Sequence, residues 1–246
     1  MTDAAGLTTS YAYDPVGRVT GTTFADGSAT STTYDAAGQA VASSDELGYT
    51  TLSAFDAAGR QTSMTDPLGN VTTTAYDAAG NQTTSIDALG HATAFVYDVA
   101  NRLVVTTYAD GTANATTYDA DGRSIAKTDP LGRVTRFGYD ALGRLLTVTD
   151  ALGQVTSYAY DGLGERVSQT DANGHTTSFA FDPRGRQIKR TLPDASFESK
   201  AYDAAGELQT RTDFMGRATA YVYDTLGRLL SRTYPDTTSV SFTLVQ

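Results

Sequence analysis

A Tyr-Asp pair returns every 21 residues along this chain. Phe replaces Tyr in two copies, and the Asp is present in all eleven. The copies begin at Tyr13, Tyr34, Phe55, Tyr76, Tyr97, Tyr118, Tyr139, Tyr160, Phe181, Tyr202 and Tyr223. A catalytic motif is ordinarily used once, whereas a phrase that recurs at a fixed interval indicates the structural unit of a repeat array.

Each repeat carries two turn signals. The first opens with the Asp of the Tyr-Asp pair and closes three residues later with Gly, as in YDALG at 139–143. Such an Asp caps a turn with its carboxylate, and Gly at the fourth position adopts a positive φ at little cost. Asn101 replaces this Gly in one copy, and Asn is the next-best residue in the left-handed region.

The second turn, half a repeat later, has two forms. In one, Asp comes first, as in DPLG at 66–69. In the other, a bulky apolar residue comes first and Asp third, as in FADG (24–27), YADG (108–111), LPDA (192–195) and YPDT (234–237). Only this second form lacks Gly, at Ala195 and Thr237, which predicts a weaker demand for left-handed backbone there.

Runs of about seven residues, rich in Thr, Tyr and Val, separate the turns and suit strands rather than helices. Each repeat is therefore predicted to be a β-hairpin of one antiparallel meander. Because the period is odd, either the two turns differ in length or each repeat carries a β-bulge. Twist accumulated over some twenty-two strands predicts a sheet that coils.

Alternation along the strands predicts one aromatic face. Tyr158 and Tyr160 lie two residues apart and share a face, while Ala159 between them points the other way. The opposite strand is predicted to contribute an apolar row: Val104, Ile125, Leu146, Val167, Ile188 and Leu230. Stacked hairpins would join these side chains into ladders that support one another.

Composition excludes several classes of protein and site. The 246 residues include 28 acidic and 18 basic ones, a net charge of −10, which argues against a nucleic-acid surface. Without Cys the chain can form neither a disulfide framework nor a thiolate zinc site. No apolar run approaches the roughly 18 residues of a membrane span, and MTDAAGLTTS at the start lacks the features of a signal peptide.

The segment YDALGRLLTVTDALGQVTSYAYD (139–161) closely resembles the YD repeat of bacterial Rhs proteins, which also occurs in teneurins and insecticidal toxin-complex subunits. The resemblance covers nearly the whole chain. It implies an all-β fold in which tandem 21-residue hairpin repeats form one long antiparallel meander sheet, coiled into a partial spiral shell. In bacterial members the shell encloses a C-terminal toxin, and in teneurins it forms an extracellular adhesion scaffold.

The expected organisation is a single YD-repeat array over residues 1–246. It comprises a half repeat (1–12), eleven repeats (13–243) and a degenerate end (244–246), where Leu244 and Val245 replace Tyr and Asp. Relatives with a cargo carry a self-cleaving core segment and a toxin after the repeats. This sequence ends at SVSFTLVQ (239–246), so neither autoproteolysis nor toxicity is expected of it.

The residues predict no catalytic, cofactor-binding or metal site. One Asp per turn is what turn geometry requires; the alternatives are a paired-carboxylate hydrolase or a calcium site like that of β-rolls, which have a shorter repeat. His91 and His175, each after a second-turn Gly, lack a third ligand and are expected to be exposed. Arg follows the fourth position of the first turn in seven repeats, which predicts ion pairs with the turn Asp worth about 0–1 kcal/mol each.

The expected function is a non-enzymatic scaffold, a wall segment that encloses or presents another polypeptide such as a toxin. The alternative is an extracellular module that binds carbohydrate or a cell surface. Expected partners are further YD repeats, a cargo polypeptide, a second copy through exposed edge strands or, in the alternative, a glycan; no nucleic acid, membrane span or cofactor is expected. The expected location is secreted or cell-surface in the full-length context, and cytoplasmic before export or as an orphan fragment.

Overall fold

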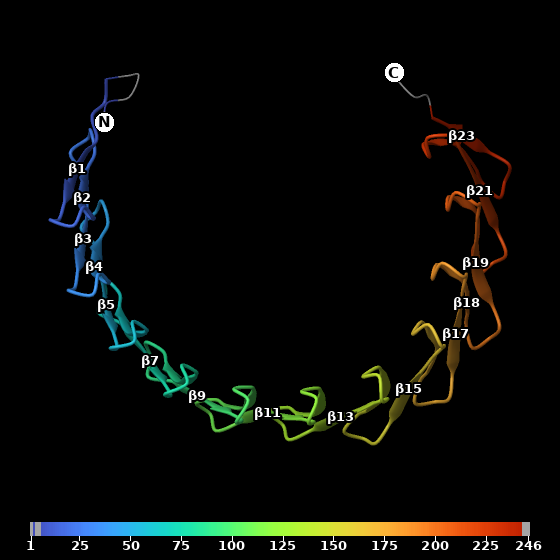
Figure 1. Cartoon of the computed structure of the whole chain (residues 1–246), viewed down its shortest axis with the longest axis horizontal. Helices are drawn as coiled ribbons and strands as arrows, with labels where there is room; N and C mark the ends of the chain where they lie inside the picture. The colour runs from blue at the N-terminus through green and yellow to red at the C-terminus, as the bar shows by residue number, and fades with distance from the viewer. Residues whose placement is uncertain (1, 3–5, 243–246) are drawn as a thin grey trace. The chain divides into compact units, whose positions relative to one another are not determined.

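The computed structural model describes residue 2 and residues 6–242, which hold strands and turns and no helix. All 23 strands belong to one sheet, and many of them are labelled along the chain in Figure 1. By its contacts the chain divides into two compact units, Met1–Thr117 with Lys127–Gly132, and Tyr118–Ala126 with Arg133–Gln246.

The strands are five or six residues long, apart from β1 and β23. The first twelve are β1 (Ser10–Tyr13), β2 (Val19–Thr23), β3 (Ala29–Tyr34), β4 (Ala40–Ser44), β5 (Thr50–Phe55), β6 (Gln61–Thr65), β7 (Val71–Tyr76), β8 (Gln82–Ile86), β9 (Ala92–Tyr97), β10 (Leu103–Thr107), β11 (Ala113–Tyr118) and β12 (Ser124–Thr128). The others are β13 (Val134–Tyr139), β14 (Leu145–Thr149), β15 (Val155–Tyr160), β16 (Arg166–Thr170), β17 (Thr176–Phe181), β18 (Gln187–Thr191), β19 (Phe197–Tyr202), β20 (Leu208–Thr212), β21 (Ala218–Tyr223), β22 (Leu229–Thr233) and β23 (Ser239–Ser241).

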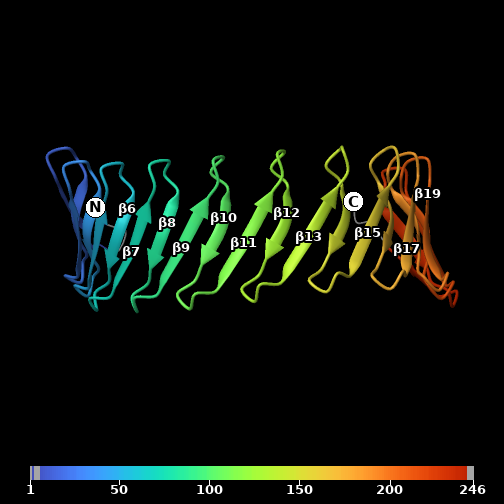
Figure 2. The ribbon, with the colours of Figure 1, turned by 90° about the horizontal axis from the view of Figure 1, so that it is seen from below.

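Each strand pairs antiparallel with its neighbours in sequence, from β1 to β11 and from β13 to β23. The predicted meander is therefore confirmed within each unit. The turns alternate between two edges of the ribbon, as Figure 2 shows. We call these the first-turn edge, where the Tyr-Asp turns lie, and the second-turn edge. The predicted coiling into a partial shell stays a prediction.

The two turns of a repeat have the same length. The N–H of Asp140 donates to the carbonyl of Arg144 (2.9 Å) and that of Asp150 to the carbonyl of Gln154 (2.9 Å), so each turn closes a three-residue loop. Loops of this length typically combine a type I turn with a left-handed residue. Equal loops leave the odd period to be absorbed within the strands.

A β-bulge in each first-turn hairpin absorbs the odd residue. Tyr139 pairs with Leu145, and Gly138 pairs with Thr147, so Leu146 has no partner. The same shift occurs in the hairpins of β1–β2, β15–β16 and β21–β22, among others. The bulge alternative is thus confirmed. Five residues of the predicted apolar row prove to be such bulge residues, each half-buried: Val104, Leu146, Val167, Ile188 and Leu230.

The fourth position of every described turn has left-handed backbone. Asn101 has φ 58°, which confirms the prediction for that position. Ala195 and Thr237 both have φ 66°, so the prediction of a weaker demand in the second turn form was wrong. First and second turns differ in the free space around the residue at the fourth position. A Cβ added at Gly48, in a second turn, would meet no atom within 4 Å, whereas one at Gly38, in a first turn, would lie 2.9 Å from the Arg18 guanidinium.

The two edges should therefore tolerate Ala unequally. Gly48→Ala is expected to cost about 1 kcal/mol, from the left-handed backbone alone. Gly38→Ala has a similar φ but also shifts the end of the Arg18 side chain, which stacks on Tyr34, so we expect a cost larger by about 0.5–1 kcal/mol. Each kcal/mol corresponds to roughly 2–4 °C in melting temperature for a chain of this size, so calorimetry resolves the difference. Equal melting temperatures for the two variants would contradict the role assigned to space.

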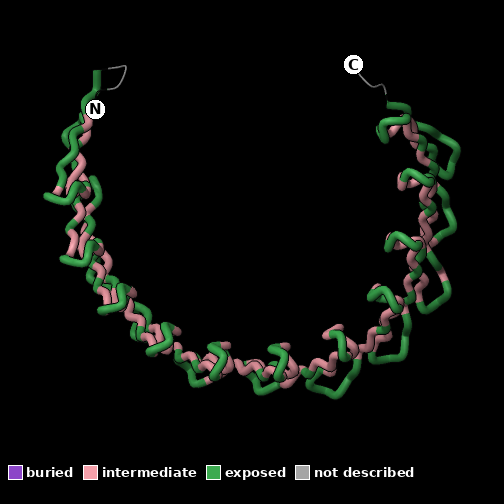
Figure 3. The backbone as a smooth tube through the Cα atoms, in the orientation of Figure 1, coloured by how far each residue is buried: buried purple, intermediate pink, exposed green. Residues whose placement is uncertain are grey.

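None of the residues that the structure describes is buried. Figure 3 shows half-buried strands between exposed turns, with no fully buried position along the ribbon. The two faces nevertheless differ. In β17, Thr177, Phe179 and Phe181 are half-buried, while Thr176, Ser178 and Ala180 on the other face are exposed. This confirms that the aromatic residues share a face, here named the aromatic face.

The ends of the predicted array lie partly outside the described residues. Gly6, in the half repeat 1–12, has φ 80°, as the repeat register predicts. Residues 3–5 of the same turn and the degenerate end at 244–246 lie outside the described residues.

Candidate functional site

The most elaborate side-chain network lies at the first-turn edge and joins consecutive repeats. The carboxylate of Asp140 accepts hydrogen bonds from the backbone N–H groups of Leu142 and Arg144, both at 2.9 Å. Its second oxygen accepts the Arg144 Nε–H at 2.6 Å. The predicted Asp caps and Asp–Arg ion pairs are thus confirmed here. This arrangement fixes the guanidinium against its own turn.

The same guanidinium also reaches the next repeat. Arg144 donates through NH1 to the Asp161 carbonyl at 3.1 Å and lies over the Tyr160 ring, 4.9 Å from its centroid. The Tyr160 hydroxyl donates back to the Leu145 carbonyl at 2.9 Å. We call this set of contacts the Asp–Arg–Tyr bridge. It ties each first turn to the Tyr-Asp pair 21 residues further on.

The bridge recurs in both units. Arg60 bonds to Asp56, donates to the Asp77 carbonyl at 3.0 Å and lies 4.6 Å from the centroid of Tyr76. The stacking part is repeated by Arg18 on Tyr34 (4.5 Å), Arg123 on Tyr139 (5.3 Å) and Arg186 on Tyr202 (4.2 Å). A cation over an aromatic ring stabilises by about 0.5–1 kcal/mol at exposed sites. Sequence reasoning paired Arg with its own Asp and missed this second partner.

A signal for the second partner was present in the sequence. Four repeats have Gln39, Asn81, Glu165 or Glu207 in place of the Arg. Both Phe substitutions for Tyr, at positions 55 and 181, occur in the repeat after such a replacement. The Gly exception has a partner too, because the Asn81 amide donates to the Asn101 side-chain oxygen at 2.8 Å. A side chain and the next turn therefore change together.

Glu165 is the most unfavourable of these replacements. Burial first, and then the charges of Asp161 and Asp182, raise the pKa of its carboxyl. The charged form is therefore penalised in the folded state. The penalty is full above the folded-state pKa and disappears as the pH falls below the unfolded value.

Glu165→Arg should restore an ion pair with Asp161 and a cation above Phe181. We expect the melting temperature at pH 7 to rise by about 1–3 °C. Glu165→Gln, which only removes the charge, should give a smaller rise. Both gains should shrink on acidification, because Glu165 then becomes neutral. A lower melting temperature for Glu165→Gln at pH 7 would contradict the repulsion.

The second-turn edge explains why its two forms never mix. In the form with Asp first, the Asp150 carboxylate caps the N–H of Gln154, four residues on, at 2.9 Å. In the other form, the Asp26 carboxylate caps the N–H of Ser28, two residues on, at 2.9 Å. Both N–H groups belong to the residue after the fourth turn position. One carboxylate is enough to cap this N–H, so a turn needs Asp at only one of the two positions. Ser28 also donates its hydroxyl to Asp26 (2.7 Å), as do Thr112, Ser196 and Thr238 to the corresponding Asp.

The two histidines occupy this capped position in second turns. His91 Nδ1 lies 2.9 Å from Asp87, and His175 Nδ1 lies 3.2 Å from Asp171. Their side chains are 60% and 62% exposed, as expected. Among the described residues there is no group of three or more His, Asp or Glu that could hold a metal ion. The predicted absence of catalytic, cofactor and metal sites stays a prediction.

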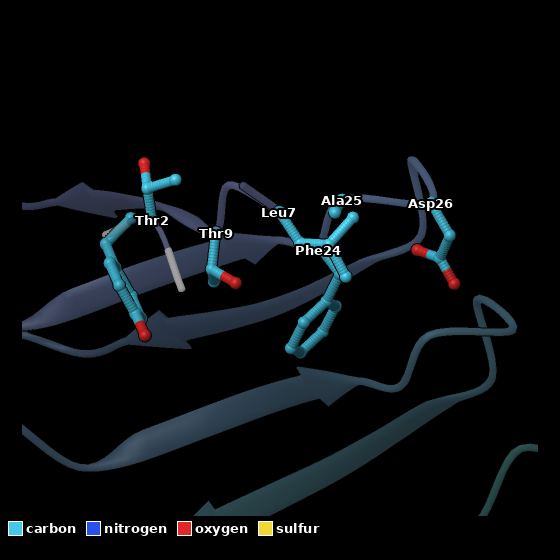
Figure 4. A pocket seen from close by; sticks show the side chains of 7 residues that line it. Thr2, Leu7, Thr9, Phe24, Ala25 and Asp26 are labelled. Atoms are coloured by element: carbon cyan, nitrogen blue, oxygen red, sulfur yellow. The ribbon is translucent and has the colours of Figure 1, made fainter. Parts of the chain in front are cut away.

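A cavity of about 410 Å³ lies beside the second turn at residues 24–27. Leu7, Tyr11 and Phe24 contribute apolar surface, and Thr2, Thr9 and Asp26 contribute polar groups; Figure 4 shows most of these side chains. The carboxylate of Asp26 already accepts both donors of Ser28. Among the described lining residues Asp26 is the only charged one, and its carboxylate is engaged within its own turn.

The turn carboxylates have lowered pKa values because they accept hydrogen bonds within their turns. Hydrogen bonds from the Arg60 side chain and backbone hold the pKa of Asp56 below its usual value. The Ser28 hydroxyl and N–H do the same for Asp26. A general acid needs the opposite shift. The arrangement is thus suited to holding turns in place.

Comparison with known proteins gives one family. The sequence model described as "RHS Repeat" matches residues 1–29, 34–71, 55–92, 76–113, 118–155, 139–175, 160–196 and 202–239. No curated protein sequence matches the chain. Among the described residues there is no helix long and apolar enough to cross a membrane.

Several solved structures are similar to this chain at low identity and low TM-score. A crystal structure of TcdB2-TccC3-Cdc42 is 16% identical, with a TM-score of 0.41, over 93% of this chain and 19% of that one. A Tc holotoxin pore from Photorhabdus luminescens is 15% identical, with a TM-score of 0.41, over 93% and 19% of the two chains. A porin-like protein from Bacteroides uniformis is 14% identical, with a TM-score of 0.29, over 76% and 86%. The chain thus spans about a fifth of the length of the first two.

Proposed function

Because this chain belongs to the RHS repeat family, we propose that it is a non-enzymatic scaffold, a segment of β-sheet wall that encloses or presents another polypeptide. The observation that carries the proposal is the absence of a buried residue among those described. A single-layer sheet stabilised between neighbouring repeats has no core of its own. Both faces therefore remain free to contact something else.

The distribution of side chains supports contact through the aromatic face. Tyr158 and Tyr160 lie on it and are half-buried, whereas Ala159 on the other face is exposed. Partly exposed aromatic residues are typical anchors of protein interfaces. They also stack on sugar rings, so a glycan-binding module remains the second candidate function.

The domain proposal is one array, with a half repeat at 1–12 and eleven repeats from residue 13. We propose that the array acts outside the cell or at the cell surface, as part of a full-length protein, because a wall around an exported polypeptide would be exported with it. The rest of the wall and any enclosed toxin would be supplied by that full-length protein.

A photo-crosslinking experiment tests the scaffold. Benzoylphenylalanine is placed at the position of Tyr158 in one variant and of Ala159 in another, and each is irradiated with reduced, alkylated α-lactalbumin as an unfolded polypeptide. We expect crosslinks from the first position and few from the second, and no signal on a glycan array. Equal crosslinking from both faces, or glycan binding without polypeptide crosslinks, would overturn the proposal.

We also propose that the edge strands bind further repeats or a second copy. Every residue of β1 and β23 is exposed, and exposed strand edges present unpaired backbone groups to other chains. Repulsion from the net charge of −10 is screened beyond about 8 Å at physiological salt. Light scattering over a dilution and salt series should report association, and a monodisperse monomer at high concentration and high salt would contradict it.

A further inference from the structure

Charge is distributed unevenly along the chain. Residues 1–100 contain eleven acidic and two basic residues, whereas residues 101–246 contain seventeen and sixteen. The strands follow the same division, because no residue of β1 to β11 is charged and every Lys or Arg within a strand lies in β12 or later. Negative charge in the first hundred residues is therefore confined to the turns, whereas positive charge later in the chain reaches the strand faces.

Cross-strand pairing places four cations on the aromatic face between β18 and β22. Two of them lie opposite aromatic residues of the neighbouring strand, and the other two lie opposite each other. The pairs are Arg190 with Phe179, Arg232 with Tyr221, and Lys200 with Arg211. One acidic residue, Glu198, shares this face and pairs with Arg190. We call the four cations the cationic patch.

The cationic patch keeps a surplus of positive charge. Glu198 lies 3.9 Å from Arg190 and 3.6 Å from Arg211, so one carboxylate is loosely shared between two guanidinium groups. The side chains of these two Arg residues are 42% and 53% exposed. Lys200 and Arg232 form no ion pair with any residue that the structure describes. A single carboxylate therefore faces four cations, whereas each bridge Arg has a turn Asp of its own.

A surface of opposite charge lies at the second-turn edge of the first unit. Three consecutive turns there have Asp first and Leu third: DELG (45–48), DPLG (66–69) and DALG (87–90). They contain four acidic residues and no Lys or Arg. Their leucines, Leu47, Leu68 and Leu89, are 80%, 84% and 81% exposed. We call these three turns the acidic edge.

We propose that the acidic edge of one copy of this chain docks on the cationic patch of a second copy. Guanidinium groups bind carboxylates in a bidentate manner. Asp45 accepts both caps of its turn through Oδ1, so its Oδ2 and the exposed Glu46 are available to a partner. Phe179 and Tyr221 provide apolar surface beside the cations for the exposed leucines.

The two surfaces differ, so the contact is heterologous, and each copy retains one surface of each kind for further copies. At about 0.1 M salt the Debye length is about 10 Å, so a docked turn interacts mainly with the patch beneath it rather than with the net charge of −10. At about 1 M salt the Debye length is about 3 Å, and the contact is lost. Pairing through edge strands relies on backbone hydrogen bonds and persists at high salt, which separates the two modes of association. The docking goes beyond a scaffold role and does not depend on a cargo.

Sedimentation velocity of the full chain tests the proposal. The patch variant is Arg211→Glu, which keeps Lys200 as an oppositely charged cross-strand partner. The edge variant combines Glu46→Lys with Leu47→Ser, and neither side chain caps the turn. We expect the unmodified chain to form larger species at about 0.1 M than at about 1 M salt, and each variant alone to lose this salt-sensitive association about tenfold or more. An equal mixture of the two variants should form a 1:1 complex, because the intact edge of one meets the intact patch of the other.

Matched variants locate the two surfaces. Arg136→Glu makes the same charge change on the opposite face of β13, where Arg136 is exposed, and Leu142→Ser removes an equally exposed leucine from the first-turn edge. Both should associate like the unmodified chain. Lys200→Gln provides a second patch variant should Arg211→Glu melt early.

Three results would overturn the proposal. The first is sedimentation of the unmodified chain that is the same at both salt concentrations. The second is unchanged association of the patch and edge variants, or no complex when they are mixed. The third is binding of labelled polyglutamate without salt-sensitive self-association, which would assign the patch to a foreign acidic polypeptide.

Discussion

Acidification is expected to unfold the sheet as the pH falls below about 4. Most turn aspartates have a pKa below the usual 3.8. In Asp66 the side chain and then the N–H of Asn70 lower the pKa of the carboxyl. In Asp213 the side chain and then the N–H of Arg217 do so. A depressed folded-state pKa means that the stability is fully present above the unfolded value and is lost as the pH falls through the folded value.

The effect should be large because the same cap recurs in every repeat. Thermal melts followed by circular dichroism should give a nearly constant melting temperature from pH 7 to about 5 and a steep fall below about 4. Glu165, whose pKa is raised, opposes the trend slightly, so its Gln variant should fall more steeply. A melting temperature that persists unchanged to pH 2.5 would contradict the capping role of the aspartates.

Truncation of one bridge tyrosine should have the largest effect among single substitutions. Tyr160→Ala removes the ring beneath Arg144 together with its hydroxyl bond to the Leu145 carbonyl, and we expect a loss of about 2–3 kcal/mol, below the range for a fully buried ring. Tyr160→Phe removes only the hydroxyl bond to the Leu145 carbonyl, worth about 0.5–1.5 kcal/mol. Natural Phe at positions 55 and 181 agrees with the milder expectation.

Hydrogen exchange together with thermal melts checks this series. Exchange should rise first in β14 to β16, since each repeat is held by its neighbours. Tyr13→Ala is the matched control, because Tyr13 is 59% exposed and belongs to the first repeat of the series. An equal loss for Tyr13→Ala and Tyr160→Ala, or for the Ala and Phe variants of Tyr160, would contradict the bridge.

Much of the fold could be predicted from the sequence because its determinants are local. A turn Asp caps N–H groups two and four residues ahead, so Asp140 and Gly143 define their turn wherever it occurs. Asn101 revealed its left-handed backbone by replacing Gly. The odd period required a bulge or unequal turns. Such interactions join residues close together in the sequence, and their recurrence in every repeat makes the pattern easy to recognise.

The sequence also misled at one point for a physical reason. The absence of Gly at Ala195 and Thr237 suggested a relaxed backbone, yet both have φ 66°. The cost of replacing Gly is the sum of the backbone strain at positive φ and the crowding around the new side chain. Second turns are uncrowded, so a side chain there meets only the strain. Most first turns, such as that of Gly38, add the side chain of the preceding repeat, and only the packed structure separates the two costs.

By itself, then, the sequence determined the period, the strands, the turns and their caps, because each depends on contacts within one repeat. Tertiary structure alone decided which side chains meet between repeats. Arg144 reaches Tyr160 only because antiparallel pairing places the two strands side by side. The bulge at Leu146 and its equivalents shifts the alternation of faces, so simple counting cannot tell that Arg190 shares a face with Phe179.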